Sequence, residues 1–265
     1  MINLSQICND AIPLIKEVGI YIKEMRKNIG TLEIHKKGVR DFVTEVDTTA
    51  ERSLVHHLQK LVPEAGFITE EKTVAQENKE YSWVIDPLDG TMNYLHGIPL
   101  YSISVALKKG EEIILGIVYE IVHDELFYSF SGSKSFCNEM EIHVSDCTEI
   151  KNALIVTGFP YIRNEERTTL LTETIKYFLD HGRDIRRLGT AATDLCYIAC
   201  GRMDAYYEGF LNSWDISAGI LILRNAGGVV VNFNGADDFS SGSVVATNPA
   251  LLNQILKGVK PLRIY

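Results

Sequence analysis

Hydrophobic positions near the start of the chain recur with helical spacing. In residues 4–28 and again in residues 48–61, apolar side chains return every three or four positions, which predicts two amphipathic helices. Pro13 lies inside the first pattern, where it either kinks the helix or marks its true start. We expect Thr48 or Asp47 to cap the second helix, because a side-chain oxygen there can accept a hydrogen bond from a free backbone N–H.

Outside these two helices, patterns typical of strands fill most of the chain up to about residue 145. Two apolar runs flank Lys109-Gly110, as in a β-hairpin. Neighbouring strands with short turns predict a largely antiparallel sheet. The polar segments 36–41 and 93–99 are expected to be loops. The expected strands are residues 31–35, 66–69, 83–85, 102–108, 113–122, 125–130 and 142–144.

Strands and helices alternate in the remainder of the chain, which predicts an α/β layer. The expected strands are residues 153–157, 184–187, 204–208, 229–232 and 244–246. The expected helices are residues 165–178, 189–200, 214–225 and 249–256.

Composition narrows the class of protein. The net charge of −9 argues against non-specific binding to nucleic acid or to an anionic membrane. The five cysteines are odd in number and form no C-x-x-C pair, so we expect a reduced, cytoplasmic protein. We recognise no signal peptide and no apolar run of about 18 residues, so no membrane span is expected.

Residues 83–91 (WVIDPLDGT) carry the first candidate chemistry. Pro87 lacks a backbone N–H, so the apolar strand is expected to end there. Asp86 and Asp89 lie three residues apart across a turn, and two such oxygen ligands suit Mg²⁺ or Ca²⁺. Gly90 allows close backbone approach, and Thr91 offers a hydroxyl and an N–H for a phosphate. The alternative is a turn that merely caps a strand.

Three more acidic residues stand where one predicted element meets the next: Asp47, Glu70 and Asp215. Such junctions gather at the open end of a sheet, where ligand sites form. Each has a structural alternative. Asp47 can serve only as a helix cap, and Glu70-Glu71 can be a charged surface turn.

Four segments together resemble the signatures of the inositol monophosphatase family, in the family's order and at similar spacing. They are residues 41–47 (DFVTEVD), 69–71 (TEE), 83–91 (WVIDPLDGT) and 214–219 (WDISAG). The resemblance continues through residues 189–191 (GTA), 204–208 (DAYYE) and 226–228 (AGG), and therefore covers nearly the whole chain.

The resemblance implies a layered α-β-α-β-α sandwich of the α+β class. Its N-terminal sheet is antiparallel-rich and its C-terminal half is mixed α/β. It also implies one domain over residues 1–265 and a homodimer. The half at about 1–150 would supply most metal ligands, and the half at about 151–265 would supply Asp215 and the pocket for the substrate's alcohol group.

The resemblance also implies a set of metal ligands. Glu70, Asp86 and the carbonyl of Leu88 match the first metal site. Asp86, Asp89 and Asp215 match the second, with Asp86 shared. Glu70 would also hold a weaker third ion through water. The implied cofactors are two or three Mg²⁺ ions, with Mn²⁺ as an alternative ion and Li⁺ and Ca²⁺ as inhibitors.

Catalytic and substrate positions follow from the same resemblance. Asp47 and Thr91 match the pair that orients the attacking water, and Glu70 matches a third catalytic position. The N–H groups of Gly90 and Thr91 would hold the phosphate. Glu208 and Ala191 match positions that contact the alcohol part of the substrate, although Glu208 has the alternative of being only a solvated charge at a strand end. The implied substrate-binding residues are Gly90, Thr91, Ala191, Glu208 and Asp215.

The implied function is Mg²⁺-dependent hydrolysis of small phosphate monoesters by in-line attack of metal-activated water, with myo-inositol monophosphate as the leading substrate. Bound cations would also offset the repulsion between phosphate and a protein of charge −9. Alternative substrates are the 2′-phosphate of NADP(H) and fructose 1,6-bisphosphate. A different class is a non-catalytic metal- or phosphate-binding protein or an RNA-linked factor. The expected partner is a small phosphorylated metabolite, not nucleic acid or a membrane.

Overall fold

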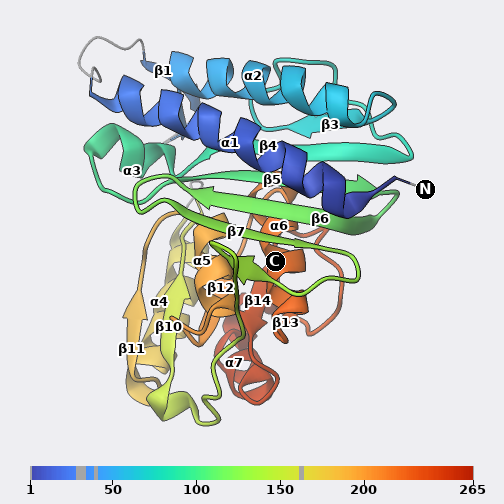
Figure 1. The fold of residues 1–265 in the computed structure, drawn as a ribbon. Coiled ribbons are helices and arrows are strands. Elements are labelled where there is room, and N and C mark those ends of the chain that lie inside the picture. The colour runs from blue at the N-terminus through green and yellow to red at the C-terminus, as the bar shows by residue number, and fades with distance from the viewer. Residues whose placement is uncertain (1, 28–33, 39–40, 161–163, 265) are drawn as a thin grey trace.

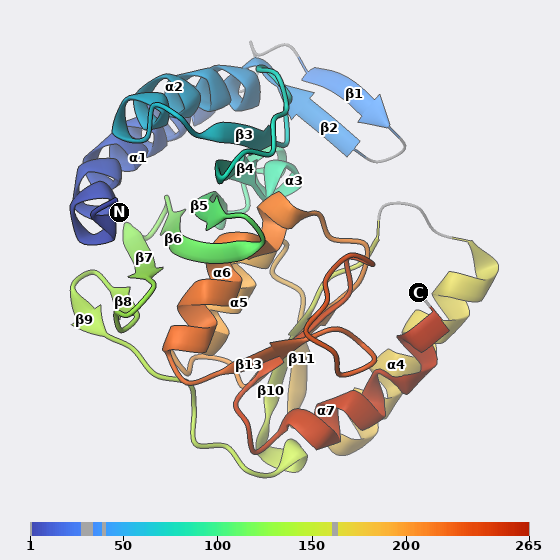
Figure 2. The same cartoon turned by 90° about the vertical axis from the view of Figure 1, so that its right-hand side faces the viewer.

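Five layers of secondary structure are stacked in the computed structural model, which describes residues 2–27, 34–38, 41–160 and 164–264. Helices α1 (Leu4–Arg26) and α2 (Glu45–Leu61) cover one face of a seven-stranded sheet. Helices α5 (Ala191–Ala199) and α6 (Ser213–Asn225) lie between that sheet and a five-stranded sheet. Helices α4 (Glu165–His181) and α7 (Leu252–Gly258) form the outer layer (Figures 1 and 2). The predicted α-β-α-β-α layering is confirmed.

The seven-stranded sheet is antiparallel except for its β3–β4 pair, and its strands run in the order β3-β4-β5-β6-β7-β8-β9. These strands are β3 (Gly66–Thr69), β4 (Tyr81–Asp89), β5 (Ser102–Lys109), β6 (Glu112–Glu120), β7 (Glu125–Phe130), β8 (Phe136–Cys137) and β9 (Met140–Glu141). The predicted β5–β6 hairpin is confirmed. A strand at residues 142–144 is wrong, because β9 ends at Glu141.

The five-stranded sheet is mixed, with strand order β11-β10-β12-β14-β13. Its strands are β10 (Leu154–Thr157), β11 (Asp184–Arg186), β12 (Ala205–Glu208), β13 (Val229–Val231) and β14 (Val244–Thr247). The remaining elements are the antiparallel pair β1 (Ile34–Gly38) and β2 (Asp41–Thr44), helix α3 (Thr91–His96) and the 3₁₀ helices η2 (Ile150–Asn152) and η3 (Lys260–Ile264).

The predicted start of the first helix is confirmed, because α1 begins at Leu4, where the Asn3 side chain accepts a hydrogen bond from the N–H of Gln6. Pro13 lies inside the helix and does not mark its start. Several other predicted boundaries are wrong. Helix α2 begins at Glu45, so neither Thr48 nor Asp47 is its cap. The loop predicted at 93–99 is helix α3 up to His96.

The segment 36–41 is not a continuous loop, since β1 extends to Gly38 and β2 begins at Asp41. Residues 31–33 and 39–40, which belong to two of these predictions, lie outside the described residues. The division into two halves of one domain at about residue 150 stays a prediction.

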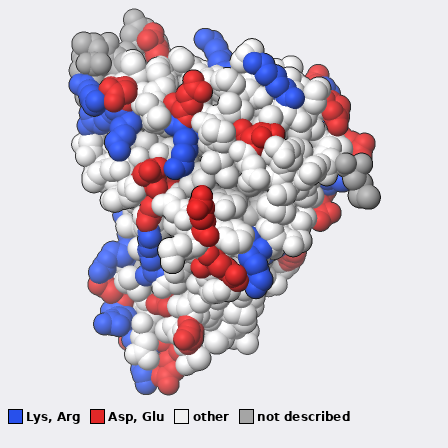
Figure 3. Space-filling view, in the orientation of Figure 1, with Lys and Arg blue, Asp and Glu red and all other residues white. Residues whose placement is uncertain are grey.

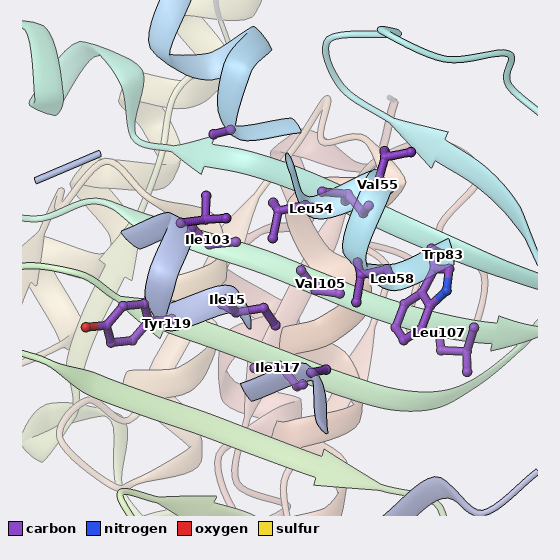
Figure 4. Packing of buried hydrophobic residues seen from close by; sticks show 14 of the residues in the cluster. Ile15, Leu54, Val55, Leu58, Trp83, Ile103, Val105, Leu107, Ile117 and Tyr119 are labelled. Carbon is purple, nitrogen blue, oxygen red and sulfur yellow. The ribbon is translucent and has the colours of Figure 1, made fainter. Parts of the chain in front are cut away.

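Both faces of the large sheet are buried, which explains the continuous apolar run in β4. Trp83 and Ile85 face α1 and α2, whereas Val84 faces α5 and α6. Figure 4 shows Leu54 and Leu58 of α2 packed beside Ile15 of α1 over the strands. Each buried aliphatic or aromatic side chain of this kind stabilises the fold by about 1.5–3 kcal/mol relative to exposure.

Charged side chains of both signs are interspersed on the face seen in Figure 3. Lys16 and Asp124, for example, form an ion pair of 3.0 Å. Mixed charge of this kind differs from the basic surface that typifies nucleic-acid binding. Within the described ranges, no helix has both the length and the apolar content that crossing a membrane requires.

Gly116 allows α6 to lie directly against strand β6. A Cβ atom at this position would lie 2.6 Å from the carbonyl oxygen of Ala218 in α6. Gly116→Ala should therefore lower the free energy of unfolding by about 1–3 kcal/mol, as overpacking does. It should also lower the phosphatase activity that the family resemblance implies, because α6 carries Asp215 in its first turn. Urea denaturation and phosphate release measure the two effects.

Leu54→Ala is the matched control, because Leu54 is fully buried on the opposite face of the sheet. This variant should lose about 2–5 kcal/mol of stability while the folded protein keeps its turnover number. Equal turnover in Gly116→Ala and wild type would show that α6 tolerates displacement from the sheet.

A carboxylate-lined candidate active site

A cavity of about 310 Å³ opens where the ends of β3, β4 and β12 meet the first turns of α5 and α6. Its size suits a small-molecule ligand. It brings together all the predicted site residues except Asp47, from segments far apart in the sequence. The predicted residues in its wall are Glu70, Asp86, Leu88, Asp89, Gly90, Thr91, Ala191, Glu208 and Asp215.

A bulge in β4 turns Asp86 and Asp89 toward the same side of the sheet. Asp86 pairs with Ser104 and Asp89 pairs with Ser102, so β4 has one more residue than β5 between these two pairs. In a regular strand, residues three apart point to opposite faces, and the extra residue corrects this phase. The strand therefore continues past Pro87 instead of ending there, because a bulge tolerates a residue without an N–H.

Asp89 is fixed by the start of helix α5. Its Oδ2 accepts hydrogen bonds from the Thr190 hydroxyl at 2.5 Å and from the N–H of Ala192 at 2.8 Å. Burial raises the pKa of Asp89 to about 6, although these hydrogen bonds oppose the rise. The carboxyl group is thus held in one orientation toward the cavity.

Asp215 is fixed by a capping box at the start of α6. Its Oδ2 accepts a hydrogen bond of 2.6 Å from the N–H of Asn212, the residue that caps the helix. Burial raises the pKa of Asp215 well above its usual range, and the charges of Asp89 and Glu70 raise it further. The helix start therefore presents this carboxyl group to the other acids.

Asp86 lies at the centre of the acidic cluster. Burial raises its pKa well above its usual range, and the charges of Glu70, Asp89 and Asp215 add to the rise. In the described part of the chain, no Lys or Arg forms an ion pair with Asp86, Asp89 or Asp215. No ion pair with a basic side chain therefore neutralises these three carboxyl groups.

The donor set of this cluster fits a hard divalent cation. Carboxylate oxygens are the ligands that Mg²⁺ prefers, and a cation would relieve the repulsion that raises the pKa of Asp86. Among the described residues, no three His, Cys, Asp or Glu side chains already stand in metal-binding geometry. The Glu70 carboxyl group near Asp86 raises the pKa of Asp86, as expected when two carboxyl groups are crowded together.

Thr91 connects this cluster to Asp47, which lies in the first turn of α2 and is almost fully buried. The Thr91 hydroxyl is 3.2 Å from Asp47 Oδ1 and 3.0 Å from the carbonyl oxygen of Leu88. Asp47 therefore belongs to the site as well as to helix α2, because it contacts Thr91 in the cavity wall.

Glu208 lies in the cavity wall and not at a solvated strand end. The Tyr206 hydroxyl donates a hydrogen bond of 2.7 Å to Glu208 Oε2. Burial raises the pKa of Glu208 to about 7, against the effects of Tyr206 and of the Arg187 charge. A side chain at Gly158 would overlap the Glu208 carboxyl group, so the absence of a Cβ there makes room for it.

Several residues in the cavity wall were given no site role from the sequence, among them Arg187, Thr190, Phe210 and Trp214. A threonine directly before a helix is a capping signal that could have identified Thr190. No local pattern distinguishes Arg187 or Phe210, since only the fold brings Arg187 near Glu208 and Arg167 over the Phe210 ring.

Glu208→Gln should become more stable relative to wild type as the pH rises. The pKa of Glu208 is about 7 in the folded protein, above its ordinary value of 4.5. Between these values the folded state binds more protons than the unfolded chain, so wild-type stability falls with rising pH. Glutamine does not titrate, so the stability difference should grow between about pH 5 and about pH 8.

Urea denaturation of both proteins in EDTA measures this difference. Tyr206→Phe serves as a second variant, because it removes a hydrogen bond that lowers the pKa of Glu208 and should widen the pH window. A stability difference that does not change with pH would mean that Glu208 titrates normally in the folded protein.

Comparisons with known proteins agree over nearly the whole chain. A model of the inositol monophosphatase family matches residues 3–262. An inositol-1-monophosphatase of Mesorhizobium japonicum is 38% identical over 234 residues, which cover 88% of each protein. A Nus factor SuhB of Pasteurella multocida is 33% identical over 260 residues, which cover 97% of each. The crystal structure of the extragenic suppressor protein suhB from Bartonella henselae superimposes with a TM-score of 0.90 at 32% identity. It covers 95% of this chain and 97% of that one.

Proposed function

The chain belongs to the inositol monophosphatase family, a family of phosphoric monoester hydrolases, and we propose that it hydrolyses small phosphate monoesters in a Mg²⁺-dependent reaction. The leading substrate is myo-inositol monophosphate. The observation that supports this most is one cavity wall that holds the acids around Asp86 together with Thr91, whose hydroxyl reaches the buried Asp47 behind it.

Two overlapping sets of oxygens would hold the cations. Glu70, Asp86 and the Leu88 carbonyl form one set, and Asp86, Asp89 and Asp215 form the other. When bound, divalent cations would offset the charge of the phosphate and lower the pKa of a nearby water molecule. The raised pKa of Asp86 supports this assignment, because a bound cation favours the ionised carboxylate.

Thr91 and Asp47 would orient the attacking water. The Thr91 hydroxyl can donate to Asp47 and accept a hydrogen bond from water, so the proton released on attack has a path to the Asp47 carboxylate. This assignment explains why a carboxylate is buried at the start of α2 within 3.2 Å of a hydroxyl in the cavity wall.

The backbone at Gly90 and Thr91 would bind the phosphate. Gly90 has a φ of +93°, which favours glycine, and a Cβ there would lie 3.3 Å from the carbonyl oxygens of Gly189 and Leu100. The glycine thus keeps the turn tight after Asp89, where the N–H groups of Gly90 and Thr91 can donate to phosphate oxygens.

Glu208 and Ala191 would contact the alcohol part of the substrate. A Glu208 carboxylate with a pKa of about 7 can accept a hydrogen bond from a substrate hydroxyl when it is ionised and donate one when it is protonated. Tyr206 leaves the second carboxyl oxygen of Glu208 available for this contact, because its hydrogen bond is to Oε2.

The expectations about bound ions, inhibitors, oligomeric state and location belong to the same proposal. They are two or three Mg²⁺ ions per site, Mn²⁺ as an alternative, inhibition by Li⁺ and Ca²⁺, a homodimer and a cytoplasmic location. NADP(H) and fructose 1,6-bisphosphate are further candidate substrates. The relatives named Nus factor SuhB make a Nus-factor role the second candidate function, which would not require catalysis.

Asp86→Asn should abolish Mg²⁺-dependent phosphate release while the fold survives. The variant loses the carboxylate shared by both ligand sets, and with it several kcal/mol of charge stabilisation, so kcat/KM should fall by about 10³-fold or more. Thermal unfolding in EDTA should show no loss of stability, because a repelling buried charge has been removed. A phosphate-release assay on myo-inositol 1-phosphate measures the loss of activity.

Asp180→Asn is the control, since Asp180 is exposed on α4 and pairs with Lys176. It should retain wild-type activity. Normal turnover in Asp86→Asn would refute the ligand assignment. A wild-type protein without phosphatase activity on any small monoester would favour the Nus-factor candidate.

Thr91→Ala should lower kcat much more than it raises KM. The hydroxyl is proposed to act on the attacking water and not on bound substrate, so its loss should cost about 10²-fold in kcat. Thr91→Ser keeps the hydroxyl and should retain most of the activity. An increase in KM alone would show that Thr91 only holds the phosphate.

A further inference from the structure

Glu51 is a buried acid that belongs to neither set of proposed cation ligands. It lies on α2 one helical turn after Asp47, and its side chain has no exposed surface. A buried carboxylate costs folding free energy unless hydrogen-bond donors surround it. The donors that contact Glu51 therefore show which part of the structure this residue holds in place.

These donors come from the turn at residues 69–73, which follows strand β3. Glu51 Oε2 accepts a hydrogen bond of 2.7 Å from the N–H of Glu71. Glu51 Oε1 accepts hydrogen bonds from the N–H and the hydroxyl of Thr73, both at 2.7 Å, and from the Thr69 hydroxyl at 3.0 Å. Hydrogen bonds to an ionised carboxylate are stronger than those between neutral groups, so one side chain binds this turn firmly to α2.

The same turn carries Glu70, which lines the cavity. The N–H of Glu70 donates a hydrogen bond of 3.1 Å to the carbonyl oxygen of Ile85, the residue before Asp86. The next residue, Glu71, is bound to Glu51. The backbone at Glu70 is thus anchored to strand β4 and, through its neighbour, to α2. The position of its carboxyl group relative to Asp86 depends on both anchors.

Lys72 shows that the turn is held in a strained conformation. Its φ is +53°, in the left-handed region that residues other than glycine seldom adopt. Strained backbone persists only where the surrounding contacts determine it strongly, and it clusters at functional sites. The N–H groups of residues 71 and 73, on either side of Lys72, both donate to Glu51. Glu51 therefore supplies contacts that keep this conformation beside the cavity, which Lys72 also lines.

We propose that Glu51 is a positioning residue, which places Glu70 for cation binding by holding the turn at residues 69–73. Both carboxylate oxygens of Glu51 already accept hydrogen bonds from that turn, so Glu51 acts through Glu70 and not as a ligand. This inference rests on the proposed function, in which Glu70 belongs to one set of cation-binding oxygens. Groups that orient metal ligands through hydrogen bonds contribute about 10–100-fold to metal affinity.

Isothermal titration calorimetry with MgCl₂ tests this inference through binding alone. Glu51→Gln keeps the size of the side chain but replaces one acceptor oxygen with an NH₂ group. Whichever oxygen is replaced, the NH₂ group faces a backbone N–H of the turn, that of Glu71 or that of Thr73. The variant should bind Mg²⁺ about 10-fold more weakly than wild type. The Mg²⁺ concentration that half-saturates phosphate release should rise by a similar factor.

Leu54→Ala is the control for a loss of stability alone, because Leu54 lies on the same helix and is fully buried in the hydrophobic core. It should keep wild-type Mg²⁺ affinity under conditions where circular dichroism shows that both variants are folded. A loss of affinity as large as that of Glu51→Gln would show that Mg²⁺ binding follows stability, which overturns the inference.

Thr73→Val is a milder second variant. It removes one hydroxyl donor to Glu51 and leaves the N–H of residue 73 in place. It should weaken Mg²⁺ binding in the same direction as Glu51→Gln but by less. If Glu51→Gln does not fold, Thr73→Val decides the question, and wild-type Mg²⁺ affinity in this variant would overturn the inference.

A double-mutant cycle with Glu70→Gln shows whether Glu51 acts through Glu70. Residues that act as a unit have non-additive effects. When Glu70 is already glutamine, Glu51→Gln should therefore change Mg²⁺ affinity by no more than about 2-fold, which is the error of additivity. The same 10-fold loss with either residue at position 70 would mean that Glu51 supports the fold in general, and the positioning role would be wrong.

The remaining outcomes separate this inference from the proposed function. Wild-type Mg²⁺ affinity in folded Glu51→Gln, with clear binding by the wild-type protein, overturns the inference alone. A wild-type protein that binds no Mg²⁺ refutes the cation sites of the proposed function, and the inference with them.

Discussion

Mutual repulsion among buried carboxyl groups is the constraint on which this structure depends. Asp86 is almost fully buried, and Glu70, Asp89 and Asp215 all raise its pKa. Such a cluster costs folding free energy unless protons or cations neutralise it. The fold therefore has to hold these acids together by other contacts. The same repulsion favours binding of a divalent cation, which would relieve it.

The layered architecture provides those contacts from several directions. The β4 bulge sets the direction of Asp86 and Asp89, the start of α5 binds Asp89, and the start of α6 fixes Asp215. The middle helix layer is pressed against the large sheet, where the Ser104 hydroxyl donates to the carbonyl oxygen of Trp214 at 3.1 Å. Because both sheets and both helix starts meet at the cavity, small shifts in packing should reach the site.

Much of the fold and the candidate site could be predicted from the sequence, and the failures have physical causes. The acidic site residues were found because they stand in recognisable motifs at the junctions between predicted elements. Glu208 was identified through the family resemblance. The end of the strand at Pro87 was wrong, because sequence rules for proline do not show that a bulge will accept it. The places of Arg187 and Phe210 in the cavity wall could not be predicted, since they depend on the fold, which brings Arg187 near Glu208 and Arg167 over the Phe210 ring.

The stability of the wild-type protein as a function of Mg²⁺ concentration tests the central claim most directly. A cation that binds only the folded state raises the free energy of unfolding by RT ln(1 + [Mg²⁺]/Kd), which is about 2.7 kcal/mol at one hundred times Kd. We predict such a rise near neutral pH, with KCl of equal ionic strength as the reference. Stability that changes no more with Mg²⁺ than with KCl would contradict the view that this carboxylate cluster is a cation site.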